Sequence, residues 1–433
     1  MRVLLVNDYG TPAGGAELQM LALREGLRAA GHDARLFSSC ASLVPAEVQA
    51  DYTCYGTTVD KLWPVMQTFN LSAARRLRSV LAQFRPEVVH VRMFLTQLSP
   101  LIMPLLRDVP SLYQVAFYRP ICPRGTKILP DGRPCREPAG VACLTHCLTP
   151  QSWVVLMMQL RLFRRWRSVF RLIVALSHAM ARRLEAEGFG PVEVVHNGVA
   201  ERPPRPPLAG PPVVAYAGRL APEKGVDVLL RAVARVRASL TGTRLLIAGD
   251  GPERDRLRAL AAELGLGPED VSFLGHLPHT ELERRLDLAW VQAVPSLWDE
   301  PFGNVTTEAM MRGTAVVASA VGAQPEIVRD NETGVLVPPG DASALAGALV
   351  RVVGDQSLAE RFGLNGRGIA LSEFAQVRVM ERFVELYDQL LPRRAASLRS
   401  ADAAAVAVPP ERDPMQDRRG RRRPRTPFAG TIA

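Results

Sequence analysis

Short runs of valine, leucine and alanine alternate with longer segments of helical periodicity along most of this 433-residue chain. Such alternation is typical of a parallel sheet whose strands are joined by crossover helices. The first half is expected to hold strands at residues 3–7, 34–37, 88–91, 111–115, 172–176 and 192–195, and helices at 16–30, 72–84, 153–169 and 178–187. The chain is therefore predicted to have an α/β fold.

A proline-rich segment divides this pattern into two halves. Residues 201–212 hold six prolines, which can continue neither a helix nor a central strand. We interpret the segment as a linker between a first domain, 1–200, and a second domain, 213–374. The second is expected to hold strands at 213–217, 244–248, 271–274, 288–294, 315–318 and 334–337, and helices at 225–239, 253–263, 280–287, 305–312 and 342–353, before a last helix at 375–391.

Two such halves predict two Rossmann-like domains whose parallel sheets face each other across a cleft, with ligand sites beyond the carboxyl ends of the strands. No run of about 18 apolar residues is present, so no transmembrane helix is expected. The first residues are interpreted as a strand and not as a signal peptide. We therefore expect the protein to be located in the cytoplasm, with the inner face of the membrane as an alternative location.

The net charge of +10 is concentrated at the end of the chain, where residues 392–433 hold ten arginines and four acidic residues. This segment is rich in alanine, proline and arginine and lacks apolar periodicity. We interpret it as a disordered, solvated tail; the alternative is weak binding to anionic lipid or nucleic acid. No specific nucleic-acid partner is expected.

Two glutamates separated by seven residues, Glu300 and Glu308, follow a predicted strand. Gly303 and Asn304 lie between them and are expected to open the next helix. A helix start offers free N–H groups and a positive dipole end, which suit an anionic or oxygen-rich guest. Carboxylates facing that guest can accept hydrogen bonds from sugar or ribose hydroxyls. The alternative is two surface glutamates without a ligand.

A basic loop, Gly218 to Gly225, follows the first strand of the second domain. Its cations, Arg219 and Lys224, flank a turn at a strand end, where they suit a diphosphate. The alternative is an ordinary surface loop. Gly249 to Pro252, which includes Gly251, follows the next strand and allows a close approach of ligand to backbone.

A glycine pair, Gly14 and Gly15, lies between the first strand and the first helix. The G-x-G-x-x-G dinucleotide fingerprint is absent, which disfavours a dehydrogenase. The pair instead offers bare N–H groups to a phosphate or hydroxyl that faces the cleft.

In this order, the motifs resemble those of family 4 glycosyltransferases. The resemblance covers about residues 1–391 and rests on Gly14-Gly15, Asn197-Gly198-Val199, the loop 218–224, residues 249–252 and the Glu300–Glu308 pair. It implies a GT-B fold, a retaining mechanism, a nucleoside diphosphate sugar as donor and no cofactor required for catalysis. A saccharide or a lipid-linked sugar is the implied acceptor.

The resemblance also implies roles for matching residues. Arg219 and Lys224 would hold the donor diphosphate, with Gly218 and Gly251 in the adjoining turns. Glu300 and the amides of Phe302, Gly303 and Asn304 would bind the donor sugar, and Glu308 the ribose. Gly15, beside Gly14, would lie on the acceptor and phosphate side of the cleft, and the last helix would cross back to the first domain.

One departure from the family is clear. Many relatives carry a histidine that contacts the donor sugar, after the strand that precedes the cysteine segment. Ala116 and Phe117 occupy that place here. His90, at the end of another strand, is expected to take a cleft role in its stead; the alternative is a partly buried histidine with a satisfied hydrogen bond.

Four cysteines cluster in a predicted insert, residues 118–150, and suit a structural zinc because four thiolates can ligate that ion tetrahedrally. They are Cys122, Cys135, Cys143 and Cys147. An iron–sulfur cluster and unligated thiols are the alternatives, and the arginines of the segment (Arg124, Arg133 and Arg136) offer contacts to an anionic acceptor.

Aromatic and basic residues alternate over 153–171, from Trp153 to Arg171. Such a helix suits the interface of an anionic membrane, and the alternative is a helix that packs its apolar stripe on the sheet. The function expected overall is sugar transfer from a nucleoside diphosphate sugar to an acceptor hydroxyl, in surface polysaccharide or glycolipid assembly. The alternatives are an epimerase or hydrolase of the same fold and a silent nucleotide-sugar-binding protein.

Overall fold

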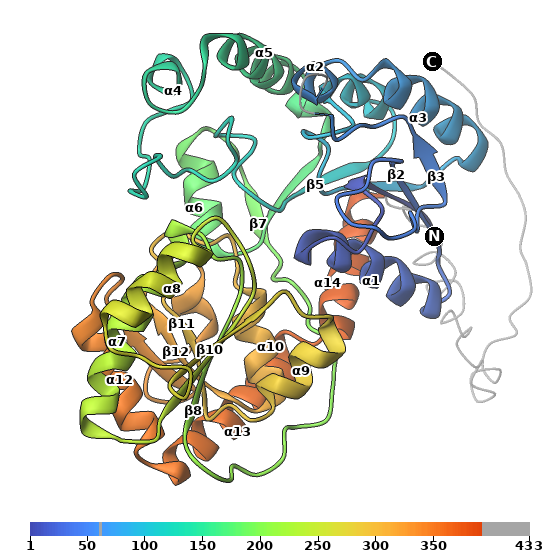
Figure 1. Cartoon of the computed structure of the whole chain (residues 1–433). Helices are drawn as coiled ribbons and strands as arrows, with labels where there is room; N and C mark the ends of the chain where they lie inside the picture. The colour runs from blue at the N-terminus through green and yellow to red at the C-terminus, as the bar shows by residue number, and fades with distance from the viewer. Residues whose placement is uncertain (60–62, 392–433) are drawn as a thin grey trace, which may run out of the picture. The chain divides into compact units, whose positions relative to one another are not determined.

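The computed structural model describes residues 1–59 and 63–391. Within these residues the chain builds two parallel sheets, each flanked by helices (Figure 1). The expected disordered tail, 392–433, lies outside the described residues. None of the described helices combines the length and apolar composition that crossing a bilayer requires.

The first sheet has seven parallel strands in the order β3-β2-β1-β4-β5-β6-β7. Its strands are β1 (Arg2–Tyr9), β2 (Asp33–Ser39), β3 (Tyr52–Cys54), β4 (Val88–Val91), β5 (Ser111–Val115), β6 (Leu172–Ala175) and β7 (Val192–Val194). The connecting helices are α1 (Gly15–Ala29), α2 (Trp63–Thr68), α3 (Leu71–Phe84), the 3-10 helix η1 (Pro100–Leu106), α4 (Val141–His146), α5 (Pro150–Trp166), η2 (Arg167–Val169) and α6 (His178–Ala186).

The second sheet has six parallel strands in the order β10-β9-β8-β11-β12-β13. These are β8 (Val213–Ala217), β9 (Arg244–Ala248), β10 (Val271–Gly275), β11 (Val291–Val294), β12 (Ala315–Ser319) and β13 (Gly334–Val337). Around them lie η3 (Pro222–Lys224), α7 (Val226–Ser239), α8 (Arg254–Glu263), α9 (His279–Leu286), α10 (Asn304–Arg312), α11 (Gln324–Ile327), α12 (Ala342–Val353) and α13 (Gln356–Glu373), and α14 (Gln376–Leu390) then returns to the first sheet. The predicted α/β fold with two parallel sheets is confirmed.

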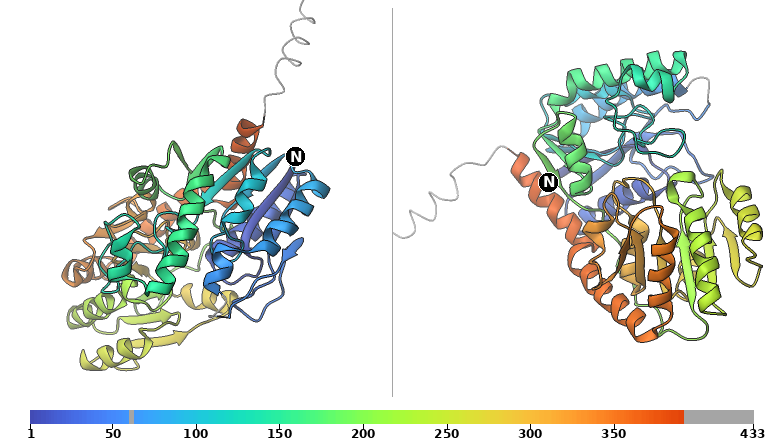
Figure 2. Two further views of the ribbon diagram at one scale, coloured as in Figure 1. Left: turned by 90° about the horizontal axis from the view of Figure 1, so that it is seen from above. Right: turned by 90° about the vertical axis from the view of Figure 1, so that its left-hand side faces the viewer.

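The chain passes between the two halves twice, and the two passages touch. The N–H of Val199 donates to the carbonyl of Phe374, and the N–H of Gln376 donates to the carbonyl of Val199. Beyond this point α14 runs beside α1 (Figures 1 and 2). Its residues Phe383 and Tyr387 are buried in one core with residues of β1 and α1.

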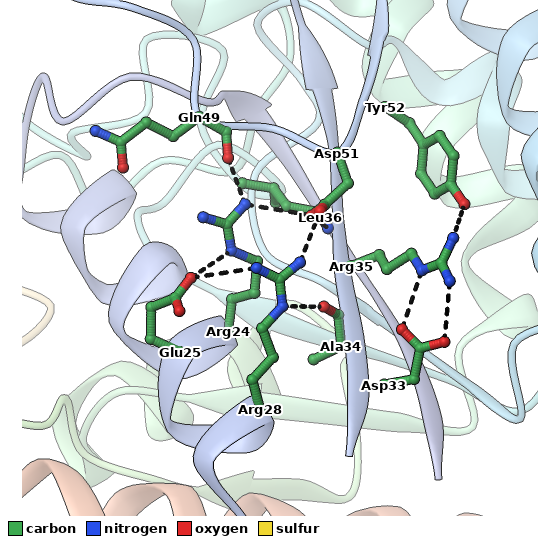
Figure 3. A network of polar contacts seen from close by, with 10 residues as sticks. All are labelled: Arg24, Glu25, Arg28, Asp33, Ala34, Arg35, Leu36, Gln49, Asp51 and Tyr52. Atoms are coloured by element: carbon green, nitrogen blue, oxygen red, sulfur yellow. Dashed lines mark hydrogen bonds and ion pairs between the residues drawn. The ribbon is translucent and has the colours of Figure 1, made fainter. Parts of the chain in front are cut away.

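Charged side chains anchor α1 to the edge of the first sheet (Figure 3). Arg24 and Arg28 on α1 contact the carboxylate of Asp51 at 3.2 and 2.6 Å, and Asp51 also accepts the N–H of Leu36 in β2 at 2.7 Å. These contacts hold the helix whose first residue, Gly15, faces the second half of the molecule.

Candidate active site

A cavity of about 260 Å³ lies between the two halves, at the carboxyl ends of both sheets. This is the location expected for ligands in open α/β sheets. Of the nine donor-site residues predicted from the sequence, six line it directly: Gly218, Lys224, Glu300, Phe302, Gly303 and Asn304.

The centre of the cavity wall is an ion pair between the basic loop and the segment before α10. Lys224 Nζ lies 2.5 Å from Glu300 Oε1 and 5.7 Å from the centroid of the Trp298 ring. The hydroxyl of Ser296 donates to the same carboxylate oxygen at 2.6 Å. Glu300 is only 6% exposed, so its orientation is determined by these two contacts.

The backbone that presents Lys224 requires glycine at the next residue. Gly225 has a φ of +65°, and a Cβ at this position would lie 2.1 Å from the carbonyl oxygen of Pro295. Only glycine allows both the left-handed conformation and this close approach. The loop therefore packs directly against the segment that follows β11, which brings Lys224 to Glu300.

The start of α10 lines the cavity beside Glu300. The helix begins at Asn304, after Gly303 in an irregular conformation. The first N–H groups of a helix have no partner within the helix and point outward along its axis. Together with the positive end of the helix dipole, they make this end suited to anionic or oxygen-rich groups.

Asn304 also connects the two halves. The side chain of Asn197, from the first half, donates through Nδ2 to Asn304 Oδ1 at 2.9 Å. On the other side, a Cβ added to Gly15 would lie 2.5 Å from Asn304 Nδ2. The predicted glycine pair, Gly14 and Gly15, thus lies against the start of α10, although neither lines the cavity itself.

Three other predicted donor residues lie outside this cavity. Arg219 is exposed, and its carbonyl accepts the hydroxyl of Tyr216 at 3.0 Å. Gly251 packs on the basic loop, where an added Cβ would lie 2.3 Å from the carbonyl oxygen of Leu220. Glu308 lies on α10, one turn beyond Asn304. Burial raises the pKa of its carboxyl group above the ordinary value, and the Arg312 guanidinium offsets only part of this shift.

His90 does not have the cleft position expected of it. The side chain is fully buried and does not line the cavity. Its Nδ1 lies 2.7 Å from the Tyr387 hydroxyl, and its Nε2 lies 3.1 Å from Gln114 Oε1. The reason is α14, which covers this part of the first sheet. The expected cleft role of His90 is therefore wrong: its hydrogen bonds are satisfied, as in the alternative interpretation, but the side chain is fully and not partly buried.

Sequence reasoning gave no site role to several polar or aromatic residues that line the cavity, among them Arg92, Asn197, Ser296 and Trp298. Arg92 follows β4 directly, and Ser296 and Trp298 follow β11. Polar side chains just after a parallel strand were the available signal. Only the fold shows that these strand ends meet at one cavity.

The four clustered cysteines surround one small cavity of about 20 Å³, together with Lys127 and Glu137. All four are free thiols, and burial raises the pKa of Cys143 and of Cys147. Within residues 1–59 and 63–391, no three or more His, Cys, Asp or Glu side chains form a set that would hold a metal ion. The structural zinc stays a prediction, without a ligand set in the structure.

Comparison with known protein families gives matches over both halves. Residues 13–202 match the model for Glycosyltransferase Family 4, and residues 200–368 match the model for Glycosyl transferases group 1. A phosphatidyl-myo-inositol mannosyltransferase of Mycobacterium leprae is 31% identical over 84% of this chain and 90% of its own length. A glycogen synthase of Mycobacterium tuberculosis is 29% identical over 89% of this chain and 94% of its own length.

Solved structures with the same fold include two of GT-B type. Sucrose-phosphate synthase from Thermosynechococcus elongatus superposes with a TM-score of 0.68 at 24% identity, over 90% of this chain and 99% of that one. Anabaena HepE, in complex with UDP and glucose, superposes with a TM-score of 0.63 at 20% identity, over 89% and 99%. The two sheets, the cavity between them and the matches over both halves lead to one conclusion: the chain belongs to the family 4 glycosyltransferases and is a transferase of the GT-B fold.

Proposed function

We propose that this enzyme transfers a sugar from a nucleoside diphosphate sugar to an acceptor hydroxyl and retains the anomeric configuration. The observation that carries the proposal is the cavity at the sheet ends, where Lys224, Glu300 and the start of α10 converge. HepE, which shares the fold, is known in complexes with UDP and with UDP-glucose.

In the proposed mechanism the donor diphosphate lies near Lys224 and the N–H groups of α10. The Lys224 ammonium has three N–H donors, so it can keep its bond to Glu300 and also contact a phosphate oxygen. Glu300 accepts hydrogen bonds from sugar hydroxyls. As the bond from sugar to diphosphate breaks, positive charge develops on the sugar and negative charge on the leaving group. Groups that hold the departing charge stabilise that state more than the bound donor.

Glu308, Arg219 and Gly251 complete the proposed donor site from outside the cavity. Glu308 is on the same face of α10 as Asn304, one turn further on, and is proposed to hold the ribose. Arg219 is exposed on the basic loop, free to approach a diphosphate.

The acceptor is proposed to bind on the side of the first half, as a saccharide or a lipid-linked sugar in surface polysaccharide or glycolipid assembly. Support for membrane contact comes from α5. Its inner face buries Leu156, Leu160 and Phe163, while its outer face exposes Val154, Met158 and three arginines. The helix therefore packs mainly on α2 and η1 and still presents an apolar and basic stripe.

The first test is a thermal-shift screen with UDP, GDP, ADP and TDP and their common sugar forms. A ligand at about 100 times its Kd adds roughly 2.7 kcal/mol to stability, so binding of one base is readily seen. Glu300→Gln is expected to lower turnover by about 100-fold. Glu263→Gln, on an exposed part of α8, is the matched control and is expected to behave as wild type.

The product then distinguishes the reactions. Sugar transfer with retention requires an acceptor and gives a product with the donor's anomeric configuration by NMR. Sugar release without an acceptor would instead identify a hydrolase. Absence of a shift with every nucleotide would contradict a nucleotide-sugar donor altogether.

A further inference from the structure

Arg92 is a buried cation at the cavity wall. It follows β4, lines the cavity from the side of the first half and is only 3% exposed. Its Nη1 donates to Gln114 Oε1 at 2.7 Å, and its Nη2 donates to Asn197 Oδ1 at 2.9 Å. Both acceptors are neutral amides, so neither balances the charge.

No salt bridge to Arg92 is formed by any residue that the structure describes. Its Nε is buried without a hydrogen-bond partner. Burial lowers the pKa of Arg92 to about 10, opposed only by attraction to the Glu17 carboxylate. Arg92 is therefore a buried guanidinium that forms neither an ion pair nor a hydrogen bond with a carboxylate of the described residues, an arrangement that burial disfavours.

A chain of hydrogen bonds determines the position of this guanidinium. Arg92 has only N–H donors, so the Gln114 group that faces it is the carbonyl oxygen. The same oxygen lies 3.1 Å from His90 Nε2, which must therefore carry the proton. His90 Nδ1 is then the acceptor for the Tyr387 hydroxyl. Arg92 is held from behind by β5 and α14.

Arg92 lines the same cavity as the start of α10. Asn197, which accepts from Arg92, donates to Asn304 at the start of α10. The small side chain of Ala116, at the end of β5, also lines this part of the cavity. A substrate group that meets the start of α10 therefore also lies close to Arg92.

We propose that Arg92 binds an oxyanion of the substrate, a phosphate or a carboxylate, from the side of the cleft opposite the basic loop. This inference rests on the proposed function and extends it, because it supplies a cation from the first half. An arginine has five N–H donors, of which two are used here. Nε–H is buried, so the remaining N–H groups of Nη1 and Nη2, one on each, are suited to a two-point contact with such a group.

Two sources of the oxyanion are possible in chemical terms: the donor diphosphate, or an acidic group on a sugar. The test compares wild type with Arg92→Met and Arg92→Lys by isothermal titration. The probes are the nucleoside diphosphate that the screen identifies, pyrophosphate and, with the nucleotide saturating, glucuronate and glucose 6-phosphate. Glucose is the neutral control. Arg205→Met, which removes another buried arginine from the linker, is the control variant.

Arg92→Met is expected to weaken the binding of at least one oxyanion probe by about 10- to 100-fold, the effect of losing a hydrogen bond to a charged group. Arg92→Lys is expected to recover part of that loss, and Arg205→Met none of it. Loss confined to the nucleotide and pyrophosphate identifies the diphosphate. Loss confined to glucuronate or glucose 6-phosphate identifies an acidic sugar.

The proposal is overturned if Arg92→Met binds the nucleotide and every other probe with the same affinity as the wild type. Failure of wild type to bind any nucleotide is the separate failure of the proposed function. If Arg92→Met does not fold, Arg92→Gln removes the charge and keeps a polar group near Gln114 and Asn197, and the same comparison decides.

Discussion

Burial is the main determinant of the charge of His90. The ring is fully buried between Tyr387 and Gln114, and the nearby Arg92 cation adds to the effect of burial. Burial and, to a smaller extent, Arg92 lower the pKa of His90 to about 3, although the hydrogen bond to Gln114 acts in the opposite direction. The imidazole is therefore neutral in the folded protein at any physiological pH, and a single tautomer satisfies both hydrogen bonds.

This neutral histidine predicts a loss of stability in mild acid. A histidine whose pKa is lowered by folding binds its proton in the unfolded chain first, so protonation favours unfolding below the unfolded pKa of 6.5. The free energy of unfolding is expected to fall by about 1.4 kcal/mol between pH 7.5 and 5.5 from this group. Urea titrations at these two pH values measure the change.

His90→Gln is expected to remove that pH-dependent part, while His279→Gln, on the exposed start of α9, is expected to keep it. The same fall in both variants would show that another group is responsible.

Charge-bearing residues in recognisable loops could be predicted from the sequence, and buried ones could not. Lys224, Glu300 and Asn304 stand in motifs beside predicted strand ends, and all three line the cavity. His90 lies within β4 and Arg92 follows that strand directly, with a single residue between them. Alternation along a strand places residues i and i+2 on one face, and both side chains contact Gln114 Oε1. Only the position of α14 determines that His90 is covered while Arg92 lines the cavity.

At the level of elements, the start of α1 and the start of α10 meet through one contact. A Cβ on Gly15 would lie 2.5 Å from Asn304 Nδ2, within the distance at which one of the two groups must move. Asn304 cannot move freely, because it is bonded to Asn197. The spacing between the two helix starts therefore depends on the absence of a side chain at Gly15.

Gly15→Ala is expected to displace Asn304 and with it the start of α10. A misplacement of about 1 Å at a reacting centre can cost on the order of 100-fold in rate. We expect turnover to fall by at least about tenfold with little change in melting temperature, as measured by kcat and by calorimetry.

Gly347→Ala in α12 is the matched control, because an added Cβ there meets nothing within 4 Å. It is expected to stabilise the protein by up to about 1 kcal/mol and to leave turnover unchanged. Wild-type turnover in Gly15→Ala would show that the contact plays no part in catalysis.

Most elements were predictable from apolar periodicity, and the exceptions have physical reasons. The helix α13 was missed because Gly363, Gly366 and Gly368 weaken its helical pattern. Two of these glycines allow close packing. A Cβ added to Gly363 would lie 2.1 Å from the carbonyl oxygen of Gly313, and a Cβ added to Gly366 would lie 3.3 Å from the side chain of Met310. The strand β3 was missed because it has only three residues and pairs only with β2.

At the scale of the whole molecule, both halves contribute to the cavity, while the stripe on α5 belongs to the first half alone. Val154 and Met158 are 53% and 43% exposed, and Arg161 and Arg165 continue the same face of the helix. Each basic residue near an anionic membrane contributes about 1 kcal/mol to binding. This surface suits an enzyme whose acceptor is carried by a lipid.

Arg161→Glu combined with Arg165→Glu is therefore expected to weaken binding to phosphatidylserine-containing liposomes by at least about tenfold in flotation assays. Arg231→Glu with Arg235→Glu is the matched control, since it reverses two exposed arginines with the same spacing on α7. Equal loss in both double variants would mean that net charge, and not α5, governs the interaction. No binding by wild type would contradict membrane contact.

The return of α14 to the first sheet also bears on how this protein is synthesised. Val3 and Leu5 of β1 share one core with Phe383, Leu386 and Tyr387. A ribosome that adds about 5 to 20 residues per second needs roughly 10 to 40 s to go from the end of β7 to α14. During that interval the nascent first half has an uncovered apolar face, so its folding cannot finish before the second half has been translated.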